Sequence, residues 1–159
     1  MFRMILATMT LATVTAGIAQ AQLIDKTALT LDGAKKIAAA AEAKAETEGA
    51  RVVIAVVDEG GNLLFLERLD ETHVASVNVG IDKARTAAIF RRPSKVFEDQ
   101  VKNGRVSALA LHGAVALQGG VPIIADGKVI GAIGVSGETP GQDEDIAIAG
   151  ASVAAGFTK

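Results

Sequence analysis

Residues 51–69 constrain the fold more than any other part of the sequence. They begin with a β-branched and almost wholly apolar run, Arg51-Val-Val-Ile-Ala-Val-Val-Asp58. Such a run is typical of a strand that is buried on both faces. The next residues, Glu59-Gly60-Gly61-Asn62, suit the positive φ angles of a tight turn, and a second strand is predicted over 63–69. The sequence therefore predicts an antiparallel hairpin with one strand deep in the protein.

A second hairpin is predicted in the C-terminal half. Residues 121–125 form a short apolar run, Asp126-Gly127 supplies a turn, and 128–135 give the return strand. Pro122 lacks a backbone N–H, which favours an edge position for its strand. The preceding apolar stretch, 109–117, is ambiguous between strand and turn.

Four helices complete the pattern. Thr30 can cap a helix with apolar residues at spacings of three, four and seven, and Gly49 ends it. Further helices are predicted over 74–90, from Pro93 to Gly104, and over 145–157. The order helix, hairpin, two helices, hairpin, helix predicts one α+β domain in which helices flank an antiparallel sheet.

The first 21 residues have the three regions of a secretory signal peptide. Arg3 provides the positive charge, an apolar stretch follows, and Ala19-Gln20-Ala21 is a small-x-small cleavage site. The stretch is shorter than the roughly 20 residues that cross a bilayer, which argues against an anchor. We therefore expect a signal peptide over 1–21, one domain over 22–159, and a periplasmic or secreted location.

Composition excludes several classes of partner and chemistry. Without Arg3, fifteen lysines and arginines face eighteen acids, a formal charge of −3 with no basic run, so nucleic acid and anionic membranes are poor partners. Cysteine is absent, and every methionine lies within the first nine residues. Neither histidine has the neighbours of a hydrolase triad. Metal or haem chemistry in the exported chain would depend on histidine, carboxylates and lysine.

Five short motifs occur in a fixed order along the chain. Together they resemble the GlcG/HbpS family, which includes the C-terminal part of PduO-type proteins, and the resemblance extends from about Leu29 to Ala155. It implies a profilin-like or PAS-like fold and assembly into higher homo-oligomers. For the ligand it leaves two expectations open: haem binding with degradation or sensing, and an accessory role in glycolate or diol metabolism. The motifs are Val57-Asp58-Glu59-Gly60-Gly61-Asn62-Leu63, Arg68-Leu69-Asp70, Lys83-Ala84-Arg85-Thr86-Ala87, Gly119-Gly120-Val121-Pro122-Ile123 and Gly131-Ala132-Ile133-Gly134-Val135-Ser136-Gly137.

His73 and His112 are the candidate ligands for a haem iron. His73 stands just before the second helix, where an imidazole is accessible, and the alternative is a solvated loop histidine. His112 lies in the apolar stretch before Gly120, so we expect its ring in or beside a pocket wall. The alternative for His112 is a buried histidine that donates to a backbone carbonyl. We prefer His112 because apolar surroundings keep water from competing for the iron.

Arg68 and Lys83, together with Arg85, form the candidate site for an acid. Cations placed at the end of a strand and along the next helix could hold a carboxylate or a haem propionate. In the alternative reading they form ion pairs within the chain, Arg68 with Asp58 or Asp70 and Lys83 with Asp82 or Glu71.

Ser136 is the last candidate, at the end of the glycine-rich strand. Its hydroxyl could donate to an anion or could satisfy a turn. The glycines of this strand permit close approach of another backbone or of a ligand. The acids at 143–145 suit the first turn of the final helix, with a metal site as the less favoured alternative.

These observations predict an exported haem-binding protein. The alternatives are a module that binds a small organic acid for a metabolic pathway and an enzyme that acts on such an acid with His112 as base. We also expect a homo-oligomer of four or more subunits, with the small-residue final helix at an interface.

Overall fold

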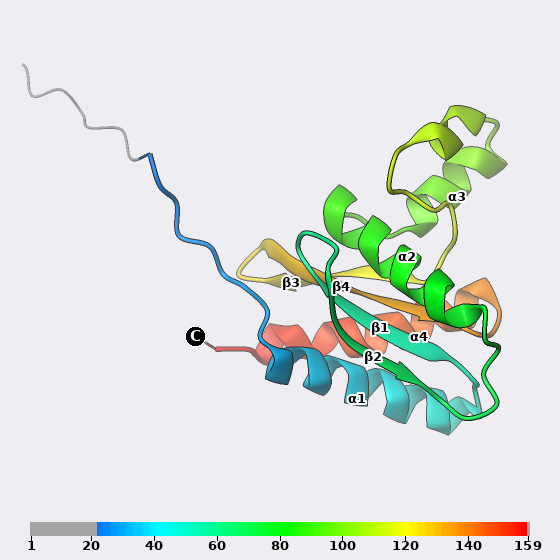
Figure 1. Ribbon diagram of the computed structural model, residues 1–159, viewed down its shortest axis with the longest axis horizontal. Helices are drawn as coiled ribbons and strands as arrows, with labels where there is room; N and C mark the ends of the chain where they lie inside the picture. Colours follow the sequence, from blue (N-terminus) through cyan, green and yellow to red (C-terminus); the bar gives the residue numbers. More distant parts are fainter. Residues whose placement is uncertain (1–21, 159) are drawn as a thin grey trace, which may run out of the picture.

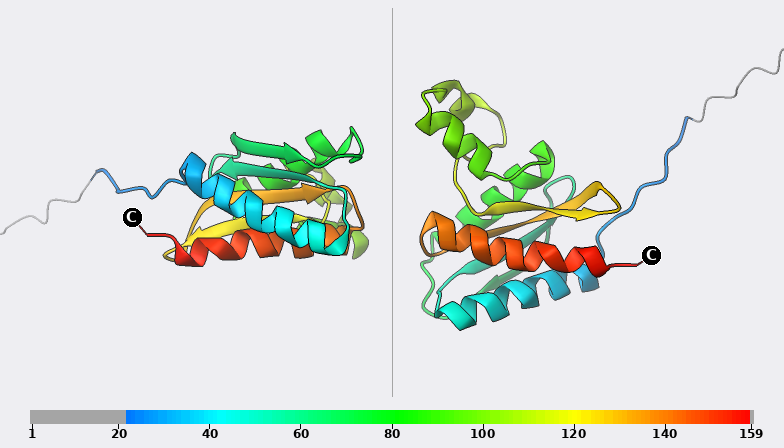
Figure 2. Two further views of the ribbon diagram at one scale, coloured as in Figure 1. Left: turned by 90° about the horizontal axis from the view of Figure 1, so that it is seen from below. Right: turned by 180° about the vertical axis from the view of Figure 1, so that it is seen from behind.

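The computed structural model describes residues 22–158, so the predicted signal peptide lies outside the described residues. A four-stranded antiparallel sheet has the order β2-β1-β4-β3. Helices α1 and α4 lie side by side on one face, and α2 crosses the other (Figures 1 and 2). The predicted α+β class is therefore confirmed. The elements are α1 (Leu31–Glu48), β1 (Val53–Asp58), β2 (Leu63–Arg68), α2 (Ser76–Phe90), α3 (Lys95–Lys102), η1 (Val106–Ala110), β3 (Gly120–Ala125), β4 (Lys128–Ser136), α4 (Pro140–Ser152) and η2 (Val153–Gly156).

Strand β1 lies between β2 and β4, with helices over both of its faces. Its residues Val53 to Val57 are fully buried, as the uninterrupted apolar run predicts. Strand β3 is at an edge, which agrees with the expectation from Pro122. Both predicted hairpins are therefore confirmed.

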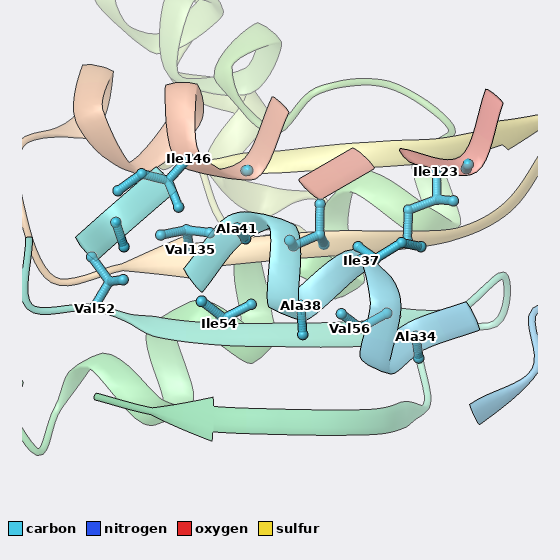
Figure 3. Close-up of a cluster of buried hydrophobic side chains, with 14 of the residues drawn as sticks. Ala34, Ile37, Ala38, Ala41, Val52, Ile54, Val56, Ile123, Val135 and Ile146 are labelled. Carbon is cyan, nitrogen blue, oxygen red and sulfur yellow. The ribbon is translucent and has the colours of Figure 1, made fainter. Parts of the chain in front are cut away.

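The main core lies between the sheet and the pair α1 and α4 (Figure 3). It contains Ile37 of α1, Ile54 of β1 and Ile146 of α4. The two helices approach closely, since a Cβ atom added at Gly150 would lie 2.8 Å from the carbonyl oxygen of Ile37. The buried Ala147 and Ala154 are also used inside the chain. These small residues therefore pack within the chain, and an interface between copies at the exposed side of α4 stays a prediction.

Helix α2 lies against the sheet at two glycines. A Cβ atom at Gly134 would be 2.1 Å from the carbonyl oxygen of Gly80, and one at Gly120 would be 2.1 Å from that of Lys83. These two glycines are paired between β3 and β4. The expected close approach of another backbone to the glycine-rich strand is confirmed, and that backbone belongs to α2.

Two boundaries differ from the sequence expectation. Helix α4 begins at Pro140 rather than near Asp145, because the Thr139 hydroxyl accepts from the backbone N–H of Gln142 and caps the helix. Residues 109–117 contain no strand and instead finish the 3-10 helix η1 and continue as a loop.

Residues 91–119, which we call the arm, project away from the sheet beyond α2 (Figure 1). The arm contains α3, η1 and the following loop, and the rest of the described chain is called the body. Phe97 is buried in the arm and meets Phe90 of α2 edge to face, with 4.9 Å between ring centroids. No helix within residues 22–158 has the length and apolar character needed to cross a membrane.

Candidate functional site

The predicted site residues gather around the two ends of helix α2. Arg68 of β2 and Ser136 of β4 are both in register with Val53 of β1, so they lie on one row across the sheet. The Thr72 hydroxyl donates to the carbonyl of Val52 at 3.2 Å, which places His73 beside the same edge of the sheet. His73, Arg68 and Ser136 therefore lie toward the start of α2.

Lys83 is buried, with 4% of its surface exposed. Its Nζ donates to Asp143 Oδ2 at 2.7 Å and to the carbonyl oxygen of Val135 at 2.9 Å. The partner is therefore Asp143, and not Asp82 or Glu71 as the sequence alternative had it. Because both polar contacts are internal, Lys83 is not available to hold a carboxylate or a haem propionate.

The Asp143 carboxyl group, the partner of Lys83, is also held by contacts within the chain. Burial raises the pKa of its carboxyl group, and the Lys83 ammonium acts in the opposite direction. Its second oxygen accepts from the backbone N–H of Glu138 at 3.0 Å. The pair ties α2 to β4 and α4. Among the described residues no group of three or more His, Asp or Glu side chains could hold a metal ion, and the Asp143 carboxylate is paired with Lys83.

Arg68 is exposed at the end of the edge strand β2. Within residues 22–158 it forms no ion pair, so the expected pairing with Asp58 or Asp70 does not occur. The Asp58 carboxylate instead accepts from the backbone N–H groups of Gly60, at 2.9 Å, and Asn62, at 2.8 Å, and so holds the hairpin turn. Ser136 is buried, with 7% of its surface exposed.

His112 lies in an exposed turn after η1, so the alternative of a buried histidine is wrong. The apolar residues around it caused the error, because Leu109 is 63% exposed and Leu117 is 45% exposed. The loop returns to α2 through Val115, whose backbone N–H donates to the Thr86 hydroxyl at 2.9 Å. A Cβ atom at the neighbouring Gly113 would lie 3.1 Å from Ile89 Cδ1, so His112 stands at the C-terminal end of α2.

The two histidines are therefore far apart. His73 is exposed in the loop before Ser76, where its carbonyl accepts from the Ser76 N–H at 3.0 Å. Between Ser76 and Ile89 an α-helix rises about 20 Å. That separation is too long for both imidazoles to ligate one iron within a single chain.

The surroundings of His112 combine apolar surface with a cation. Ile89 is partly exposed, and both it and Arg85 approach the glycine turn of the first hairpin, at Gly61. Arg85 Nε donates to the Gly61 carbonyl at 3.4 Å, and its Nη1 lies 3.0 Å from Asp82 Oδ1. Sequence reasoning included Arg85 in the basic constellation but missed Ile89, whose exposure depends on where the arm leaves α2.

A separate hollow of about 700 Å³ lies at the end of the sheet where the second hairpin turns, on the side covered by α1. Leu29, Ile130 and Phe157 provide apolar lining, and Lys36 of α1 contributes a cation. None of the five predicted site residues lines this hollow. No sequence pattern indicated it, because its walls come from both ends of the described chain and from the second hairpin.

Comparison with known proteins identifies relatives of this chain. The family model described as haem degrading protein HbpS-like matches residues 29–152. Protein GlcG of Escherichia coli (strain K12) is 42% identical over 111 residues, which cover 70% of this chain and 83% of GlcG.

Two solved structures share the fold. Protein ORFY of Klebsiella pneumoniae has a TM-score of 0.81 and 31% identity, over 87% of this chain and 99% of ORFY. PduOC, solved as a haem complex, has a TM-score of 0.72 and 26% identity, over 79% of this chain and 94% of PduOC.

Proposed function

This chain belongs to the family of HbpS-like haem degrading proteins, and from that membership we propose that it binds haem, with His112 as the ligand to the iron. The family description and the relative solved with haem support this ligand class. The observation that carries the choice of site is the exposed imidazole of His112 beside apolar surface.

The residues around His112 suit an amphipathic, flat ligand. A haem needs an iron ligand, apolar contact for the macrocycle and a cation for the propionates. His112 offers the first, and Ile89 and Leu109 offer exposed apolar contact. Arg85 offers the cation, although Asp82 competes for it. Haem bound there would supply a redox-active iron, while the chain positions it and partly excludes water.

His112 is a better candidate than His73. Next to His73, Val74 offers exposed apolar contact. The surface around His112 lies where the arm meets the end of α2, and there both Ile89 and Leu109 offer such contact. Lysine would first have to lose a proton from a reference pKa near 10.4 before it could bind iron. Within residues 22–158, Met, Cys and Tyr are absent, which leaves imidazole as the fitting ligand.

The test is hemin titration of the purified protein with absorbance at the Soret band. We expect a shifted and sharpened band, and His112→Ala should weaken binding at least tenfold, about 1.4 kcal/mol. His73→Ala is the matched control and should bind as the parent does. If both single variants and the double variant all bind hemin like the parent, hemin only adsorbs to the surface and the proposal fails.

The second candidate function is binding of a small organic acid. It is favoured by the hollow at the start of α1, where Lys36 stands beside apolar lining. Lys83 does not favour it, since its ammonium is buried and paired with Asp143. Failure of the hemin experiment would make this function the leading one.

We place the proposed activity outside the cytoplasm. The signal pattern over residues 1–21 supports export, and the mature chain would then begin at Gln22.

A further inference from the structure

Charge is divided unequally between the arm and the body. The arm has five basic and two acidic residues, a formal charge of +3. The described body has nine basic and sixteen acidic residues, a formal charge of −7. The modest net charge of the chain therefore conceals two oppositely charged parts.

The positive charge of the arm is not neutralised within it. Lys95 pairs with Asp99 and Lys102 pairs with Glu98. The exposed Arg91, Arg92 and Arg105 have no acidic partner among residues 22–158. Next to Arg105 stands Val106, which is 66% exposed, so the arm presents apolar side chains as well as cations. Charged and apolar groups together are typical of protein interfaces, in which arginine is enriched.

A groove with the complementary charge lies between α1 and the loop after β2. Glu42 and Glu46 of α1 and Asp70 line it, and Leu69 contributes an apolar surface. Burial raises the pKa of the neighbouring Glu67, and the charge of Glu42 raises it further. Like charges held this close repel one another and favour a cationic partner.

Among the described residues that line this groove, Arg51 is the one cation beside three acids. Arg51 borders it, but its guanidinium lies 3.4 Å from Glu71 outside the groove. Glu42, Glu46 and Asp70 have no ion-pair partner within residues 22–158. The arm of the same chain cannot supply one, because it projects from the α2 side while α1 covers the other face of the sheet (Figures 1 and 2).

We propose that the arm of one copy docks into the acidic groove of a second copy of this chain. Arg91, Arg92 and Arg105 supply the charge that the groove lacks. Contact between two arms would place positive surface on positive surface, which disfavours that arrangement. Because the arm and the groove lie on opposite sides of the sheet, the contact between copies is head-to-tail, and a closed ring of copies would fill every groove with an arm.

The experiment measures molar mass by light scattering and sedimentation velocity on the haem-free purified protein. Two triple variants reverse the two surfaces separately: Arg91→Glu, Arg92→Glu and Arg105→Glu in the arm, and Glu42→Lys, Glu46→Lys and Asp70→Lys in the groove. We expect the parent to associate, each variant to dissociate at least 100-fold more readily, and an equal mixture of the two variants to associate again. Circular dichroism confirms that each variant is folded.

A third variant controls for net charge alone. Lys35, Lys36 and Lys128 are exposed on the body, and their replacement by glutamate changes the formal charge as the arm variant does. This variant should associate like the parent. The proposal is overturned if the parent is monomeric across the micromolar range, if either interface variant keeps the mass of the parent, if the mixture stays dissociated, or if the lysine control dissociates too. None of these outcomes depends on whether His112 binds hemin.

Discussion

The body and the arm are stabilised in different ways. In the body, β1 is buried from Val53 to Val57 and α2 lies in backbone contact with two strands. In the arm, Phe97 and Ala108 are the buried apolar residues, and much of its attachment is polar. Large apolar burial gives the body a high free energy of unfolding, whereas a few hydrogen bonds give the arm a low one. The surfaces proposed for haem and for a second copy both involve the more weakly held region.

Loss of the buried ion pair between Lys83 and Asp143 should lower the free energy of unfolding of the body more than any other change considered. Lys83→Met leaves the Asp143 carboxylate buried without its partner, which costs about 3 to 5 kcal/mol of unfolding free energy. The double variant Lys83→Met with Asp143→Leu removes both charges and should recover most of that loss. Urea unfolding measures both values. A double variant no more stable than Lys83→Met would show that the pair stabilises by shape and not by charge.

The same variant should acquire a characteristic pH dependence. Burial raises the pKa of the Asp143 carboxyl group above its ordinary value, and removal of the opposing Lys83 ammonium raises it further. The folded variant then holds the proton more tightly than the unfolded chain. Its stability is greatest below the unfolded pKa and falls as pH rises through the folded pKa. The deficit relative to the parent should therefore be larger at about pH 8 than at about pH 5; equal deficits would exclude Asp143 as the titrating group.

One methyl group added where α2 packs on the sheet should lower the free energy of unfolding almost as much as loss of the ion pair does. In Gly134→Ala the new Cβ atom would lie 2.1 Å from the Gly80 carbonyl oxygen and 2.5 Å from the Ala84 nitrogen. Both are backbone atoms, so α2 must move, and we expect a loss of about 3 kcal/mol in urea unfolding. Gly141→Ala is the control, because nothing lies within 4 Å of its Cβ position in α4. Equal stability of the two variants would mean that α2 can shift without cost.

The contrast between body and arm also explains what the sequence could predict. The hairpins follow from local patterns, namely the apolar run before Asp58 and the turn residues Gly60 and Gly61. The edge position of β3 follows from Pro122, because a missing N–H is a property of one residue. Such signals are strongest in the body, where regular structure and burial coincide.

The errors arose where contacts are distant or where apolar residues are exposed. Lys83 and Asp143 are 60 positions apart, and no local pattern distinguishes this pair from one with Asp82. The apolar stretch around His112 suggested burial, but Leu109 and Leu117 are exposed on the arm. Apolar content indicates burial only when an element covers it, and the arm extends beyond the covering helices.

The smallest loss of stability should come from a substitution at Ser94, where the arm joins the body. This residue is fully buried, and its hydroxyl donates to the Leu117 carbonyl at 2.5 Å and accepts from the Gly120 N–H at 2.8 Å. Ser94→Ala leaves both backbone groups without this partner, a cost of about 1 to 3 kcal/mol. Because the arm has few other attachments, the loss should appear as local opening.

Hydrogen exchange read by mass spectrometry separates local from global opening. Peptides that cover 111–119 should exchange faster in Ser94→Ala, while those that cover β1 should exchange as in the parent. Ser152→Ala is the control, since its hydroxyl donates to the Ala149 carbonyl on an exposed surface and its loss should change neither region. If hydrogen exchange in β1 becomes faster by as much as exchange in 111–119, the arm and the body unfold as one unit. If only the arm accelerates, the chain can adjust its His112 surface and its arginines without loosening the sheet that carries them.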